Sequence, residues 1–115
     1  NLGLKGSNKV VAIDWGSLTS IAPGALDFSW YLIISATRID ATRDEIIEDY
    51  KLIAGERFNE KALGLSLIGA FARLGWNKAI DVLENNDEKK KSIEQADLDW
   101  WIQRITKELN TWSPI

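Results

Sequence analysis

Three residue types are missing from this chain altogether: cysteine, histidine and methionine. Without cysteine and histidine, the 115 residues exclude thiolate or imidazole metal sites and catalysis by Cys/His or Ser/His/Asp groups. Any chemistry must therefore come from carboxylates, amides, hydroxyls, lysine or arginine. Because translation normally starts with Met, we expect a chain that begins at Asn1 to derive from a longer product or a processed precursor.

An excess of basic residues is also lacking, since the net charge is −3 and the isoelectric point is about 4.9. Nothing in this balance favours nucleic acid or an anionic membrane as a partner. No signal peptide is recognisable at the start of the chain. With 45% apolar residues the chain can form a real core, and we expect a cytoplasmic protein without a membrane span.

The first fifteen residues predict a β-hairpin. The run Val10–Ile13 is apolar and mostly β-branched, which is typical of a short buried strand. Leu2–Leu4 precedes it, and the polar, glycine-containing segment 5–8 lies between the two. A short loop of this kind between two apolar runs is typical of a hairpin turn.

The register of this hairpin determines the face on which Asp14 lies. If Leu4 is opposite Lys9, Asn1 is opposite Ala12, and side-chain alternation puts Asp14 on the same face. The oxygens of a carboxamide and a carboxylate suit a hard cation such as Mg²⁺. This register therefore predicts a metal site at Asn1 and Asp14, whereas a register shifted by one would separate them.

The same stretch carries a family resemblance. Asn1, the hairpin, an apolar strand ending Ile13-Asp14-Trp15, a Gly/Pro loop and Leu26-Asp27-Phe28 resemble the aminoglycoside phosphotransferase-like kinases, relatives of choline, homoserine and fructosamine kinases. The resemblance implies the C-terminal lobe of a kinase-like fold, with Asn1 and Asp14 as its metal ligands. It also implies that Asp27 opens a helix and braces the catalytic loop, without being the base.

Further implications of the resemblance concern groups outside this sequence. The catalytic base, the nucleotide-binding lysine and the phosphate-covering loop would belong to an N-terminal nucleotide-binding lobe that precedes this fragment. The intact protein would transfer the γ-phosphate of Mg²⁺–ATP to a hydroxyl of a small molecule. The fragment alone would be inactive, because it contains neither the base nor that lobe.

Residues 25–39 are apolar almost all round, which predicts a helix buried on most sides. In that helix, Asp27 has an alternative role as a charge that compensates the helix dipole. Thr42 and Glu45 form a capping box that opens an amphipathic helix, and Gly55 is expected to end it.

A further helix is expected over 60–74, capped by Asn59. Its interior glycines, Gly64 and Gly69, predict the close approach of another helix, because glycine costs about 1 kcal/mol there relative to alanine. Gly75 is expected to break or bend this helix before another apolar stripe reaches residue 84.

The polar run 85–91 reads as a linker, and Ser92 with Gln95 offers a second capping box for the last helix. Trp100 lies off the apolar stripe of that helix and is expected to pack against another element or to line a pocket.

Together these segments predict a mainly α (α+β) fold, in which a short N-terminal β-hairpin packs on a bundle of four to five helices. Residues 1–24 would form the hairpin and metal-site loop, and residues 25–115 the helical subdomain. The alternative function is a non-catalytic helical interaction module. In that case the glycine-containing helix faces and the six tryptophans would mark a partner surface or a homo-oligomer.

Overall fold

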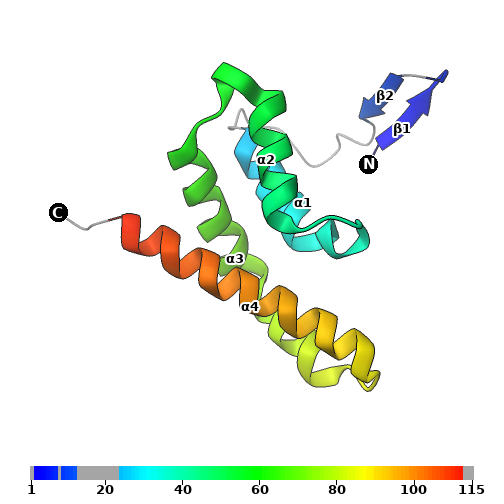
Figure 1. Cartoon of the computed structure of the whole chain (residues 1–115), viewed down its shortest axis with the longest axis vertical. Coiled ribbons are helices and arrows are strands. Elements are labelled where there is room, and N and C mark those ends of the chain that lie inside the picture. Colours follow the sequence, from blue (N-terminus) through cyan, green and yellow to red (C-terminus); the bar gives the residue numbers. More distant parts are fainter. Residues whose placement is uncertain (1, 8, 13–23, 113–115) are drawn as a thin grey trace.

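Helices make up the folded body of the protein in this computed structural model, which describes residues 2–7, 9–12 and 24–112 (Figure 1). The α-helices of these residues are α1 (Gly24–Ser35), α2 (Arg43–Ala54), α3 (Glu60–Glu84) and α4 (Glu88–Thr111). Short 3₁₀ turns, Ala36–Arg38 and Gly55–Arg57, follow α1 and α2. The longest helix, α3, packs against both α4 and α1 and so forms the centre of the body.

The N-terminal strands lie outside this helical body. β1 (Leu2–Lys5) and β2 (Lys9–Ala12) pair antiparallel, and Figure 1 shows them to one side of the helices. Within the described residues, no extensive contact joins either strand to a helix. The predicted α+β fold, with a hairpin packed on the bundle, is therefore wrong, and the fold is mainly α. Two strands of this length bury too little apolar surface to form a layer of a fold.

The ends of α2 and the start of α3 follow the local sequence signals. The Thr42 hydroxyl accepts from the Glu45 backbone N–H (3.2 Å), and the Glu45 carboxylate accepts from the Thr42 backbone N–H (2.8 Å), which confirms the capping box. Gly55 ends α2 with φ 54°, a conformation that favours glycine. Asn59 caps α3 by accepting from the Ala62 backbone N–H at 2.9 Å.

The hydrogen bonds from Thr42 lower the pKa of the exposed Glu45 carboxyl below its ordinary value. A carboxyl whose pKa is lower in the folded state stabilises that state above its ordinary pKa. This contribution is lost as the pH falls through the lowered value. The start of α2 is therefore sensitive to acid.

The other two predicted boundaries are wrong. Gly75 does not interrupt α3, which continues to Glu84 with the ring of Phe71 packed over this glycine. The last helix begins at Glu88, because the Asp87 carboxylate already accepts the backbone N–H groups of Lys89 and Lys90 at 3.0 and 3.2 Å. Once the helix has started there, its first turn of lysines, which are good helix formers, extends it through the predicted cap at Ser92.

Trp101 of α4 is fully buried at the centre of the core. The ring of Phe71 from α3 lies nearly parallel to it with centroids 5.9 Å apart, and Trp100 meets it edge-on at 5.1 Å. The apolar cluster around Trp101 joins α1, α2, α3 and α4 through Ala25, Leu32, Ile33, Ile47, Leu63, Leu67, Ala70 and Ile105. An aromatic pair of this geometry adds about 0.5–1.5 kcal/mol to the stabilisation from buried area.

Gly64 lies directly against a side chain of α4. A Cβ added at this position would lie 2.5 Å from Oε2 of Glu108, a buried carboxylate of α4. The predicted close approach is therefore confirmed at Gly64. It does not extend to Gly69, where an added Cβ would meet nothing within 4 Å.

These two glycines give a matched test of the α3–α4 contact. We expect Gly69→Ala to raise the free energy of unfolding by about 0.5–1 kcal/mol, because alanine is the better helix former. Gly64→Ala has the same propensity gain but displaces the Glu108 carboxylate, so it should be less stable than Gly69→Ala by about 1–3 kcal/mol. Urea unfolding followed by circular dichroism measures both, and equal stability of the two variants would contradict the contact.

Candidate functional site

The predicted metal ligands, Asn1 and Asp14, both lie outside the described residues. The strands between them pair with Leu4 opposite Val10 and Lys5 opposite Lys9, so the predicted register is wrong by one residue. Lys5 extends the strand, and the shorter turn that remains contains Gly6 at φ 70°. The convergence of Asn1 and Asp14 depended on the other register, and the described strands therefore give it no geometric support.

Asp27 lies in the first turn of α1 and is exposed. Three and seven residues later on the same side of the helix come Trp30 and Ile34, and each is 45% exposed. Leu26 has the same exposure, so α1 is not buried all round as its sequence predicts. We refer to Leu26, Trp30 and Ile34 as the open side of α1. Asp27 stands at its N-terminal end.

A buried ionic cluster lies where α2, α3 and α4 meet. The Asp97 carboxylate from α4 is 1% exposed and contacts the guanidinium of Arg43 from α2 through Oδ1. Its other oxygen, Oδ2, lies 2.9 Å from Nζ of Lys78 from α3. Moving a carboxylate out of water costs several kcal/mol, so Asp97 can be buried only because two cations face it.

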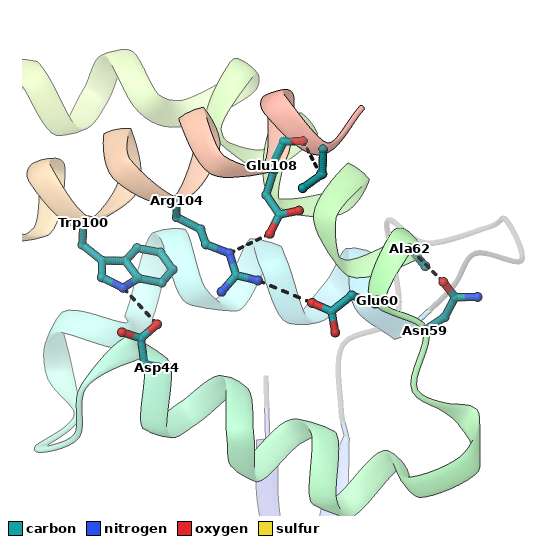
Figure 2. Close-up of polar contacts among 8 residues, drawn as sticks. Asp44, Asn59, Glu60, Ala62, Trp100, Arg104 and Glu108 are labelled. Atoms are coloured by element: carbon teal, nitrogen blue, oxygen red, sulfur yellow. Dashed lines mark hydrogen bonds and ion pairs between the residues drawn. The ribbon is translucent and has the colours of Figure 1, made fainter. Parts of the chain in front are cut away.

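Trp100 extends this cluster toward the surface. The Arg43 guanidinium lies 5.9 Å from the centre of the Trp100 ring, within the range of a cation–π contact. Figure 2 shows the indole N–H of Trp100 donating to the Asp44 carboxylate of α2, at 3.3 Å. The expectation that Trp100 packs against another element is thereby confirmed.

A second polar group ties α4 to the start of α3. In Figure 2 the Arg104 guanidinium reaches Glu108 on its own helix at 2.7 Å and Glu60 of α3 at 4.0 Å. Glu60 is 66% exposed and its contact with Arg104 is long, so this pair contributes little, whereas the Arg104–Glu108 pair holds the carboxylate that packs against Gly64.

The polar contacts of Asp97, Trp100 and Arg104 hold helices together, and they provide little for catalysis or ligand binding. Both oxygens of Asp97 face cations, so this carboxylate is not open to a substrate. In the part of the chain that the structure describes, no group of three or more Asp and Glu side chains is placed to hold a metal ion. The depression beside Trp100 measures about 190 Å³, less than the roughly 300–1,000 Å³ of typical small-molecule sites.

Arg43, Lys78 and Asp97 are the residues that the sequence analysis missed. One signal was present: Asp97 precedes the core residues Trp101 and Ile105 by four and eight positions, which puts a charged residue on the buried side of α4. A charge at such a position requires partners from other helices. Sequence spacing does not identify which lysine or arginine supplies them.

Comparison with known proteins gives no relative: no family model, no curated protein and no solved structure matches this chain. Among the described helices, none is both long and apolar enough to cross a membrane.

The buried ionic cluster predicts a large difference between two neighbouring aspartates. Asp97→Asn leaves Arg43 and Lys78 without their carboxylate and should lower the free energy of unfolding by about 3–5 kcal/mol. Asp99→Asn is the control, because Asp99 is exposed and only accepts from the Gln95 side chain. It should change stability by less than about 0.5 kcal/mol.

Urea unfolding followed by tryptophan fluorescence measures both variants. Adding Lys78→Met to Asp97→Asn should restore part of the loss, since one unpaired buried cation is then removed. A small effect of Asp97→Asn would show that the cluster does not hold the three helices together.

Proposed function

We propose that this chain is the C-terminal, helical part of an ATP-dependent small-molecule kinase of the aminoglycoside phosphotransferase-like type, acting in the cytoplasm. The sequence pattern around Asn1, Asp14 and Asp27 motivates the proposal. The nucleotide-binding lobe and the catalytic base would come from another part of the intact protein. The acceptor would be a hydroxyl group of a small molecule.

The observation that carries this proposal is the placement of Asp27. An aspartate that braces a catalytic loop must be open to a neighbouring segment, and Asp27 is exposed in the first turn of α1. It lies beside the open side of α1, whose large apolar residues favour cover by another part of a protein. An exposed aspartate and an exposed apolar side are both expected of a helix that packs against the remaining part of a kinase.

In this proposal the side-chain oxygens of Asn1 and Asp14 suit Mg²⁺, because this ion accepts carboxamide and carboxylate ligands. The assignment of Asn1 and Asp14 as its ligands rests on the family resemblance alone, since the strand register does not support their convergence. Mg²⁺ held there would neutralise charge on the phosphates during transfer. Asp27 would accept backbone N–H groups of the catalytic loop and so keep that loop in place. The helical body would supply a rigid support for these segments.

A second function, a non-catalytic helical interaction module, also has an observation in its favour. The helical body has its own core and its own ionic cluster, and the residues that form them lie on α1, α2, α3 and α4. A body of this kind can present an apolar helix side to a partner without any catalytic group. The sequence encoded upstream distinguishes the two: a catalytic loop with a His/Gly-x-Asp pattern and a strand lysine favour the kinase.

Activity of the intact protein tests the proposed metal ligand directly. Asp14→Ala should lower ATP-dependent phosphoryl transfer at least about a hundredfold, because the charge on the phosphates is no longer neutralised, while helical content stays unchanged. Asp49→Ala is the matched control, since Asp49 is exposed on α2 and outside the proposed machinery. Near-normal turnover of Asp14→Ala would remove the metal assignment.

A further inference from the structure

The outward side of α3 carries a continuous apolar seam. Its six positions follow each other at spacings of four, three, four, three and four residues, the repeat by which two helices pack along their length. None of them is charged, and the three large side chains, Leu65, Trp76 and Leu83, are 50%, 61% and 78% exposed. The seam consists of Leu65, Gly69, Ala72, Trp76, Ala79 and Leu83.

The polar atom of Trp76 is already satisfied within α3. Its indole N–H donates to the backbone carbonyl of Arg73 at 3.0 Å, which holds the ring along the helix. The exposed part of the ring is therefore apolar, and covering it would leave no donor without a partner. A tryptophan of this kind is well suited to be the central residue of an interface.

We propose that the seam of α3 is a self-association surface, on which a second copy of this chain packs its own α3 antiparallel around a two-fold axis. In this pairing, two residues face each other across the axis when their residue numbers add up to 148. Trp76 of each copy then lies over Ala72 of the other, and Gly69 faces Ala79. Leu65 faces Leu83 at both ends, so the seam complements itself in size, as a two-fold interface requires.

A parallel pairing fits less well. It would place Trp76 against Trp76 and would leave the glycine and alanine positions facing each other across a gap, which loses contact area. The antiparallel pairing also brings the exposed Lys61 of one copy to the end of the other α3, where Glu84 and Asp87 are exposed. The two Arg73 side chains flank the axis, and their long stems let both guanidinium groups reach water.

The contact area of the seam limits how tightly the two copies bind each other. At a rise of about 1.5 Å per residue the seam is about 27 Å long, and a contact strip on a helix is about 10 Å wide. This footprint is well below the roughly 800 Å² per partner of a standard stable interface. The dimer therefore belongs to the weak, transient class. This inference needs only α3 and does not depend on the proposed kinase function.

Sedimentation velocity of the chain over a micromolar to millimolar concentration series tests the proposal. We expect a dimer that grows with concentration. Leu65→Glu, or Ala72→Trp, which fills the space needed by the indole, should raise the dissociation constant about tenfold or more. The control, Leu52→Glu, alters a 78% exposed leucine on α2 and should leave the constant unchanged. Circular dichroism confirms that each variant folds.

Cysteine cross-linking tests the orientation, because the natural chain has no cysteine of its own. Mixed under mild oxidation, the Ala72→Cys and Trp76→Cys variants should form a disulfide with each other. Ala72→Cys alone should form little disulfide between two copies of itself. A chain that stays monomeric to millimolar concentration, even if its α3 binds a different protein, overturns the proposal, and so does equal cross-linking of Ala72→Cys to itself.

Discussion

The contact of one buried carboxylate with two cations joins three of the helices. Asp97 cannot stay inside the protein unless both Arg43 and Lys78 reach it, and each comes from a different helix. The apolar core around Trp101 supplies most of the driving force for folding, but apolar packing alone tolerates shifts between helices. The ionic cluster adds a directional contact between α2, α3 and α4, all of which border the apolar core that α1 shares.

Local signals in the sequence predicted the helical part of the fold well. The capping box at Thr42 and the cap at Asn59 depend only on neighbours three residues away, which the sequence displays directly. Gly75 and Ser92 misled the prediction, because the Phe71 ring covers the glycine and Asp87 caps α4 before Ser92 is reached. The hairpin register depended on whether Lys5 belongs to the strand or to the turn, and apolar pattern does not decide that.

The candidate site was less predictable for a different physical reason. The pairing of Asn1 with Asp14 depended on one register, and a shift of a single residue reverses every face of a strand. The ionic cluster joins residues far apart in the sequence, from Arg43 to Asp97, and no spacing rule connects them. Asp27 was placed correctly at the start of a helix, because its position there is a local property. The catalytic loop proposed as its partner is not among the described residues.

Hydrogen exchange of the α1 amides tests the central proposal, that this chain is the helical part of a larger kinase. The measurement compares the present chain with the intact protein under the same conditions. The account predicts slower exchange from Asp27 to Ile34 in the intact protein, because another part of it covers the open side of α1. Equal exchange of these amides in both proteins would mean that nothing packs on this side, and would contradict the account.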